Sequence, residues 1–337
     1  MDLSRVTSLV ARSLQARLPL LEAPHQQALR LFNGYTEGLP GLGVDVYGQT
    51  LLVHDALGPE GEPAAVEAVV ELARAALPWL SCGLVKLRES KVQALRNGTL
   101  LFGEQAELCR KVREDGTWYA VRLTLNRDAS LYLDTAGLRR WARAQLSGQR
   151  VLNAFAYTGS LSVAAKAGGA AQVVSTDLNR AFLTVAKDSF ALNGWPVARP
   201  DFITGDFFDV VGRLKRERAL FDCVFVDPPF FSVTAQGRVD LEEDPLQVLN
   251  KVRPLVADGG RLVALNNGVF VSGAAFEATL AEVCAGGYAE VEERLEVPES
   301  YTGTAATREG APAVDPAPYR HATKMAVLRL KRKDGRR

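Results

Sequence analysis

The chain has 337 residues, of which 47% are hydrophobic and 23% charged, and its formal net charge is +1. This length favours two domains, and the small net charge excludes an argument for nucleic-acid binding from overall charge. The four cysteines lack a Cys-x-x-Cys spacing, and there is neither a signal peptide nor a run of about 18 apolar residues, so we expect a cytoplasmic protein without a metal site or a membrane span.

The first part of the chain is predicted to form a small α+β domain. Residues 3–31 have the apolar spacing of a helix, interrupted near Leu18-Pro19, and residues 43–54 have the pattern of a hairpin. A helix over 62–78 and strands over 83–87, 99–102, 107–113 and 117–124 follow. We therefore expect a helical segment over 1–28 and the α+β domain over 29–125.

The rest of the chain, 126–337, alternates strands with helices. Strands are expected at 150–155, 172–176, 201–204, 221–226, 261–265, 290–296 and 324–331, and helices at 135–147, 160–167, 179–193, 207–218, 242–256 and 273–285. Such alternation predicts βαβ units in a doubly wound, Rossmann-like parallel sheet. Residues 302–318, rich in Gly, Ala and Pro, are expected to form a surface loop.

Polar residues follow three successive strands of this sheet. The first turn, Asn153 to Ser160, contains Gly159, which permits close approach of the backbone to a ligand; the alternative is an ordinary strand-to-helix turn. Asp177 ends the second strand, where an acid typically binds ribose hydroxyls, although it could simply cap a helix. Asp206 and Phe207 follow the third strand and suit an adenine amino group and ring face, with a helix cap again the alternative.

These three positions together indicate a nucleoside cofactor. The first turn does not have the Gly-x-Gly-x-x-Gly pattern of a pyrophosphate cradle. A nucleoside without a pyrophosphate points to S-adenosylmethionine.

Asp227-Pro228-Pro229-Phe230 directly follows the apolar strand 221–226. Two prolines end that strand and make the loop rigid, and they present one carboxylate and one aromatic ring at the edge where open α/β sheets bind ligands. The loop suits a planar, hydrogen-bonding base, and Asn266-Asn267 after the next strand could hydrogen-bond a base edge, although Asn-Gly is also a turn signal.

The cysteines test one type of methylation. Transfer to carbon 5 of a pyrimidine requires a cysteine nucleophile, whereas transfer to a nitrogen does not. Cys223 lies within a predicted strand, Cys284 near the end of a late helix, and Cys82 and Cys109 in the first domain. None is expected at the ligand-binding edge.

With these residues in view, the chain resembles the bacterial large-subunit rRNA methyltransferases of the RlmI/RlmO/RlmK superfamily over roughly residues 30–330. Residues 33–48 are similar to the family segment NGEGDGLPGLxVDRYG, residues 131–134 to its FLD motif beside the cofactor, and residues 153–160 to its NxFSYTG turn. The resemblance implies a class I methyltransferase sheet, an RNA-contact role for the small domain, and 23S rRNA as partner, with room for a homodimer.

The resemblance also implies site residues. The expected catalytic residues are Asp227, Pro228, Pro229 and Phe230. The expected S-adenosylmethionine-binding residues are Tyr132, Asp134, Asn153, Phe155, Tyr157, Thr158, Gly159, Asp177, Leu178, Asp206, Phe207 and Asp227. The expected substrate-binding residues are Phe230, Phe231, Asn266 and Asn267.

The chain departs from the family pattern in two ways. Many relatives carry an N-terminal PUA domain, for which this sequence begins too late, and the 5-methylcytosine members have a catalytic cysteine where this chain has Asn266-Asn267. A guanine nitrogen is therefore the favoured acceptor over cytosine carbon 5. A methyltransferase of the same fold acting on a small molecule or protein, and a non-catalytic RNA-binding assembly factor, are the alternatives.

Overall fold

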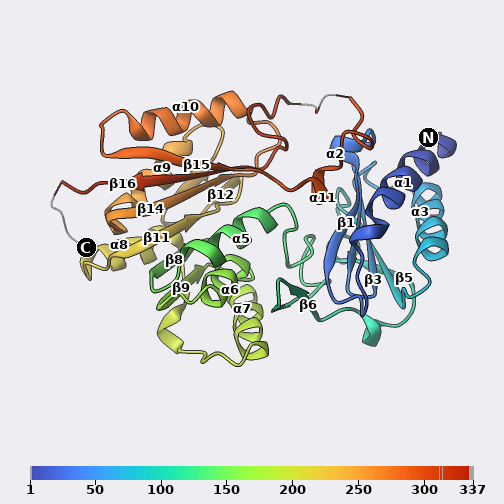
Figure 1. Cartoon of the computed structure of the whole chain (residues 1–337), viewed down its shortest axis with the longest axis horizontal. Helices are drawn as coiled ribbons and strands as arrows, with labels where there is room; N and C mark the ends of the chain where they lie inside the picture. Colours follow the sequence, from blue (N-terminus) through green and yellow to red (C-terminus); the bar gives the residue numbers. More distant parts are fainter. Residues whose placement is uncertain (1, 311, 313, 334–337) are drawn as a thin grey trace. The chain divides into compact units, whose positions relative to one another are not determined.

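The computed structural model describes residues 2–310, 312 and 314–333, and the chain forms two compact units (Figure 1). The first unit comprises Met1–Asp134 with Pro298–Ala313, and the second comprises Thr135–Val297 with Val314–Arg337. These boundaries differ from the expected 1–28, 29–125 and 126–337, because a late segment of the chain returns to the first unit.

The first unit is built on a five-stranded sheet of order β1-β2-β3-β4-β5, in which only β3 and β4 are parallel. Apolar side chains of two helices, α1 and α3, pack on one face of it with those of the strands. A separate two-stranded hairpin, β6–β7, follows the sheet. The elements are α1 Leu3–Arg17, β1 Ala28–Asn33, α2 Gly34–Glu37, β2 Leu42–Tyr47, β3 Thr50–Asp55, α3 Pro63–Ala76, β4 Cys82–Leu87, α4 Gln93–Asn97, β5 Thr99–Phe102, β6 Lys111–Glu114, β7 Thr117–Ala120 and α11 Glu299–Thr302.

The helical spacing of residues 3–31 is only partly realised. Helix α1 ends at Arg17 before Leu18-Pro19, but residues 28–33 form strand β1, paired antiparallel with β2. Pairing along a whole sheet edge outweighs the weak local preference of these residues for helix.

The returning segment is held to the first unit by buried hydrogen bonds. Thr36 Oγ1 donates to Thr302 O at 2.6 Å, and Asn33 Nδ2 donates to Tyr301 O at 3.2 Å. Thr302 and Thr307 are buried, so this part of the expected surface loop is packed. The composition of the segment predicts an irregular backbone, but it does not indicate that the segment forms hydrogen bonds with Asn33 and Thr36.

Glu37 is the centre of this attachment. Its carboxylate accepts from Arg17 Nη1 at 2.9 Å, from Ser13 Oγ at 3.0 Å and from the Asn33 N–H at 2.8 Å, and both charged side chains are almost fully buried. Arg17 Nε also donates to Ser300 O at 3.0 Å. The buried ion pair of Arg17 and Glu37 thus joins α1, α2 and the segment that contains α11.

The second unit is a seven-stranded sheet of order β10-β9-β8-β11-β14-β16-β15. Strands β8, β9, β10, β11 and β14 pair in parallel, while β16 is antiparallel to both β14 and β15. The elements are α5 Ala136–Gln145, β8 Arg150–Ala154, α6 Ser160–Ala167, β9 Gln172–Asp177, α7 Arg180–Leu192, β10 Phe202–Thr204, α8 Phe207–Arg216, β11 Phe221–Val226, β12 Phe231–Val233, β13 Arg238–Asp240, α9 Pro245–Val252, β14 Val256–Asn266, α10 Gly273–Cys284, β15 Ala289–Leu295 and β16 Lys324–Leu330. The predicted fold class is confirmed.

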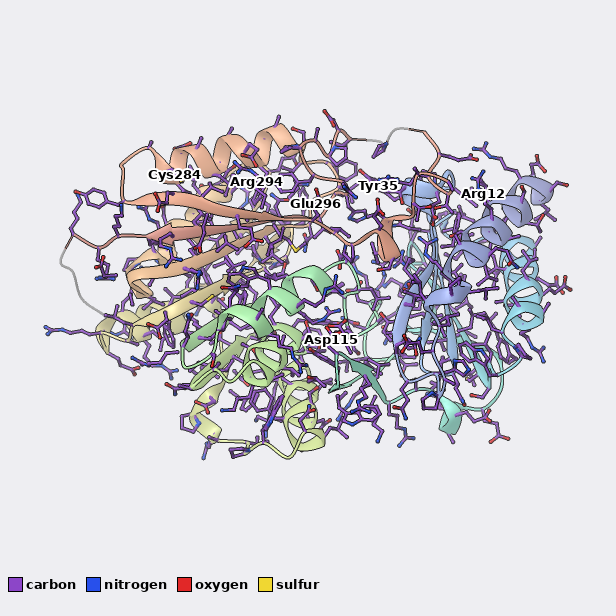
Figure 2. The ribbon with its side chains drawn as sticks, viewed as in Figure 1. Arg12, Tyr35, Asp115, Cys284, Arg294 and Glu296 are labelled. Atoms are coloured by element: carbon purple, nitrogen blue, oxygen red, sulfur yellow. The ribbon has the colours of Figure 1, made fainter. Side chains whose placement is uncertain are left out.

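Helices cover both faces of this sheet, as the continuous apolar strands require. On one face, α8, α9 and α10 pack against alternate strand residues such as Leu152, Val224 and Leu262. On the other, Trp141 of α5 meets Phe225 edge to face, and Ser162 of α6 bonds to Asn153. Cys284 closes α10 and Arg294 lies on β15 (Figure 2).

The buried Glu37 gives a test of the first unit. Glu37→Gln leaves the Arg17 guanidinium buried without a counter-charge, and removing one member of such a pair costs about 3–5 kcal/mol. We expect a loss of this size in the free energy of unfolding of the first unit, measured by denaturant titration.

Glu309→Gln is the matched control, because Glu309 pairs with Arg12 while both side chains remain more than one-third exposed. An exposed pair contributes at most about 1 kcal/mol. Equal losses for the two variants would contradict the central role of Glu37.

Candidate active site

The carboxyl ends of five parallel strands meet at one edge of the second unit. Ala154 of β8 lies opposite Thr176 of β9 on one side and Val226 of β11 on the other, and Val226 lies opposite Ala264 of β14. The chain runs from β8 outward through β9 to β10 and then returns to the other side of β8 as β11. This reversal is the switch point at which open α/β sheets bind ligands, and we call the edge the rim.

The turn after β8 is conformationally strained. Phe155 and Tyr157 have left-handed backbone, with φ of 60° and 50°, and Gly159 follows with φ of 76° before α6 begins. A Cβ on Gly159 would lie 2.6 Å from that of Ala186 in α7. Non-glycine residues in this region cost about 1–3 kcal/mol each and gather at functional sites.

Asp177 holds this turn in place. Its carboxylate accepts from the Tyr157 N–H at 2.8 Å and from the Asn179 N–H at 2.8 Å. Burial raises the pKa of Asp177, and the two backbone hydrogen bonds lower it by less. Two carboxylate oxygens offer about four acceptor positions, so room remains for a further donor. The neighbouring Leu178 is 62% exposed.

Asp206 and Phe207 begin α8 at the same rim. Asp206 caps the helix by accepting from the Phe208 N–H at 2.8 Å, while its second oxygen has no hydrogen-bond partner in the part of the chain that the structure describes. The Phe207 ring is buried and stacks on Phe155 with centroids 4.4 Å apart. Phe155 is the less buried ring of the pair.

Asn153 lies below the turn in a buried polar group. Its Nδ2 donates to Ser162 Oγ at 2.9 Å, and Ser175 Oγ donates to the same hydroxyl at 2.8 Å. The Asn153 Oδ1 is buried and has no partner among residues 2–310, 312 and 314–333. A buried acceptor without a donor is costly and marks a place where a ligand or water hydrogen is expected. Thr158, in the turn above, is also buried.

The Asp227-Pro228-Pro229-Phe230 loop leaves β11 beside β8. Asp227 and Phe230 are half-buried, Pro228 is buried and Pro229 is exposed. A Cβ on Gly268 would lie 2.8 Å from two atoms of the Phe230 ring. The loop after β11 therefore rests on the loop after β14, and only glycine at 268 allows the ring this position.

Phe231 opens the short β12–β13 hairpin and is 53% exposed. The Arg238 guanidinium lies 5.3 Å from its ring centre. A small, mostly apolar pocket lies behind the loop, lined by Val226, Pro228, Leu241, Pro245, Asn266 and Phe276 among others.

The two asparagines after β14 differ in their surroundings. Asn266 is buried and its Oδ1 accepts from the Gly268 N–H at 2.9 Å, whereas Asn267 is exposed. Asn266 thus shapes the turn, as the Asn-Gly turn signal indicates.

Sequence reasoning missed Lys324, which lies opposite Asn266 in the register of β14 and β16. Its buried ammonium donates to Gly268 O at 3.1 Å, to Val271 O at 2.8 Å and to Ala322 O, and so secures the loop after β14. Burial lowers the pKa of Lys324 to about 8. Its signal was a single lysine at the start of an otherwise apolar strand.

Tyr132 and Asp134 lie in the first unit, at the end of its N-terminal part. The preceding Leu131 carbonyl accepts from the buried Tyr47 hydroxyl at 2.7 Å, which fixes this segment. Burial above all, and also the charge of Asp134, raises the pKa of the Tyr301 phenol.

Comparison with known proteins identifies the family. Residues 31–311 match the family described as S-adenosylmethionine-dependent methyltransferase. The chain belongs to this family. This match confirms the prediction that the chain is a member of a family of S-adenosylmethionine-dependent methyltransferases.

Named relatives are similar over parts of their length. The ribosomal RNA large subunit methyltransferase K/L of Psychrobacter sp. is 35% identical over 186 residues, which cover 54% of this chain and 23% of that protein. The ribosomal RNA large subunit methyltransferase I of Photobacterium profundum is 29% identical over 273 residues, covering 78% of this chain and 66% of that protein. The matched part of the chain thus spans only 23% and 66% of the lengths of these two relatives.

The fold is also found in a crystal structure, that of SMU.776 complexed with SAH. It superimposes with a TM-score of 0.83 at 20% identity and covers 98% of this chain and 82% of that one. Among the described residues, no helix combines the length and apolarity needed to cross a membrane.

The rim fits the family's cofactor on its own chemistry. Gly159 permits close backbone approach, Asp177 keeps acceptor capacity toward hydroxyl groups, and Asp206 has a free oxygen for an amino group. When bound, S-adenosylmethionine supplies a methyl group on a positively charged sulfur.

The buried lysine predicts a pH dependence. Because the folded-state pKa of Lys324, about 8, lies below its ordinary 10.5, the unfolded chain binds more protons between these values. Its contribution to stability is therefore greatest above pH 10.5 and is lost as the pH falls to 8. We expect the difference in free energy of unfolding between wild type and Lys324→Met to rise in favour of wild type across this window.

Denaturant titration of both proteins at a series of pH values measures this difference, and subtraction removes the groups that the two proteins share. A difference that stays constant or falls as the pH rises would contradict the lowered pKa of Lys324 in the folded chain.

Proposed function

We propose that the protein methylates a base of large-subunit ribosomal RNA, using S-adenosylmethionine, and that a guanine nitrogen is the acceptor rather than cytosine carbon 5. The carrying observation is the rigid Asp-Pro-Pro-Phe loop at the switch point, beside a turn and two acids suited to a nucleoside. The two relatives named as ribosomal RNA methyltransferases support RNA as the substrate class.

Each part of the rim has a proposed role toward the cofactor. Tyr157, Thr158 and Gly159 would pack on its methionine end, and Asp177, next to the exposed Leu178, would accept from the ribose hydroxyls. Asp206 would accept from the adenine amino group. The stacked pair of Phe155 and Phe207 would supply the apolar wall, with Phe155 as the more accessible ring. Tyr132, Asp134 and Asn153 are proposed to complete the site from the resemblance.

The acceptor base would meet the loop after β11. Asp227 would orient it by hydrogen bonding, Pro228 and Pro229 would keep the carboxylate in a fixed direction, and Phe230 would stack on the base. Phe231 and the exposed Asn267 would contact its surroundings, while Asn266 would act through the turn that it shapes. A base within folded RNA has to leave its stack to reach such a rim.

The cysteines of the second unit support transfer to nitrogen. Cys223 lies inside β11, level with Val151 and short of the rim, and burial raises the pKa of its thiol. Cys284 ends α10, and a helix that follows a parallel strand returns to the opposite edge of the sheet. Neither can act as the nucleophile that carbon-5 transfer requires. A ring nitrogen attacks with its own lone pair and needs only alignment.

The substrate defines where the protein acts. Ribosomal RNA as substrate implies action in the cytoplasm, and 23S rRNA is the specific RNA that we propose. The homodimer considered from the resemblance stays a prediction.

Transfer of tritiated methyl groups tests the substrate. We expect the purified protein to label 23S rRNA from a strain that lacks its gene and not rRNA from the parent strain, because the parent's target is already methylated. Mass spectrometry of the nucleosides should show methylguanosine. Labelling of both RNAs, of neither, or of cytosine carbon 5 would contradict the proposal.

Asp227→Asn tests the loop. Loss of a positioned hydrogen-bonding carboxylate lowers catalytic efficiency by at least about 100-fold. We expect such a loss in kcat/KM for methyl transfer, with the cofactor Kd from calorimetry changed little.

Asp222→Asn is the control on the same strand. Asp222 lies at the amino end of β11 and accepts from the Arg150 N–H at 2.8 Å, a bond that asparagine can also accept. It should keep full activity. A fully active Asp227→Asn enzyme would contradict the catalytic role proposed for the Asp-Pro-Pro-Phe loop.

A further inference from the structure

The first unit carries an exposed basic and aromatic surface on the β6–β7 hairpin. Arg113 pairs with Trp118 and Lys111 with Ala120 across the two strands, so these residues share one face. The intervening Val112 and Tyr119 are buried on the other face. Lys111 and Arg113 are exposed, and Trp118 is half-buried. We call Lys111, Arg113 and Trp118 the hairpin face.

The two cations of the hairpin face are held by the indole ring. Lys111 Nζ lies 4.5 Å and Arg113 Cζ 5.6 Å from the centre of the Trp118 ring. Stacking on an aromatic ring restricts long side chains that would otherwise be mobile, which reduces the entropy lost on binding an anion. Neither cation forms an ion pair with any residue that the structure describes.

The hairpin is fixed to the sheet of the first unit. The Arg113 N–H donates to Gln26 O at 2.7 Å, and the Cys109 N–H donates to Thr50 Oγ1 at 2.9 Å. The pairing continues past the strands, since the Val121 N–H donates to Arg110 O at 2.8 Å. Arg110 and Arg122 extend the run of exposed basic residues. Of the two neighbouring acids, Glu114 ends β6 and pairs with Thr117 on the opposite face of the hairpin, and Asp115, labelled in Figure 2, lies in the turn.

Several residues of the other basic clusters bind to groups within the protein, and one cluster lies far from the rim. Lys86 is buried and donates to Asn126 O at 2.6 Å and Asp128 O at 2.7 Å, and Arg88 pairs with Asp128. Arg139 is buried and donates to Thr135 Oγ1 at 2.9 Å. Arg213 to Arg218 lie at the end of α8, at the edge of the sheet opposite the rim. The hairpin face keeps its charges available.

We infer that the hairpin face binds the sugar–phosphate backbone of the RNA substrate, an inference that rests on the proposed function. Preorganised cations beside an aromatic ring match phosphates and an unstacked base, and they contribute affinity without reading sequence.

Lys111→Ala/Arg113→Ala tests this inference, because it removes two charges and leaves Val112 and Tyr119 in place. Each lost phosphate contact lowers the slope of log Kd against log salt by about 0.7 to 0.9, so we expect the slope to fall by about 1.4 to 1.8 between about 50 and about 200 mM salt. Fluorescence anisotropy with 23S rRNA fragments, without cofactor, measures the Kd at each salt concentration and hence the slope. Lys111→Arg/Arg113→Lys should restore binding.

Lys187→Ala/Arg199→Ala is the matched control. Lys187 also lies over an aromatic ring, 5.5 Å from the centre of Phe202, and the double change removes the same charge from the second unit. It should leave the slope close to that of wild type. An unchanged slope in the hairpin variant, or equal losses in the two variants, overturns the inference.

Methyl transfer, measured in parallel on the same RNA, separates this inference from the proposed function. If the wild-type protein methylates rRNA and the hairpin variant binds RNA normally, the inference about the hairpin face is wrong and the proposed function stands. If the wild-type protein binds RNA through the hairpin face but transfers no methyl group, the proposed function is wrong and the inference about the hairpin face stands. If the wild-type protein does not bind RNA, both the inference and the proposed function are wrong.

Discussion

The parallel pairing of β8 with β9 on one side and β11 on the other is the constraint on which the site depends. It brings Ala154, Thr176 and Val226 to one level, so the loops that follow these strands leave the sheet at the same edge. Asp177 then joins two of the loops by accepting backbone hydrogens from both, and Phe230 joins two others by lying on Gly268. The residues proposed to act on cofactor and base are thereby positioned by backbone geometry.

In the first unit, buried charges add to the apolar core formed by α1, α3 and the sheet. Asp45 accepts from Arg30 and lies 3.1 Å from His54 Nε2, in a row across β1, β2 and β3. Arg30 holds the pKa of Asp45 low against the effect of burial, and burial lowers the pKa of His54. In the segment 33–48, Gly34 is required because a Cβ there would lie 2.0 Å from Leu39 O, and Glu37 anchors the returning segment. The segment 33–48, on which the resemblance to the family partly rests, therefore stabilises the fold of the first unit.

Much of the second unit could be predicted from its sequence, because apolar strands and capped helices produce local patterns. The acids at the strand ends followed from spacing, and the structure brings Asp177, Asp206 and Asp227 to one rim. Other features depend on contacts between distant segments. The burial of Phe207 under Phe155, the anchoring of residues 298–310 by Glu37, and the lysine that secures the loop after β14 have no local pattern. The availability of a charge is likewise a tertiary property, which is why Lys86 and Lys111 could not be distinguished by composition.

A crystal structure of the protein with bound S-adenosylhomocysteine is the decisive test of the proposed site, because it locates the cofactor whatever the identity of the RNA. We expect the ligand at the rim, with ribose hydroxyls donating to Asp177, the adenine amino group near Asp206 and the sulfur directed toward Asp227. A ligand bound away from the carboxyl ends of β8, β9, β10 and β11, or with its sulfur directed away from the Asp-Pro-Pro-Phe loop, would contradict it.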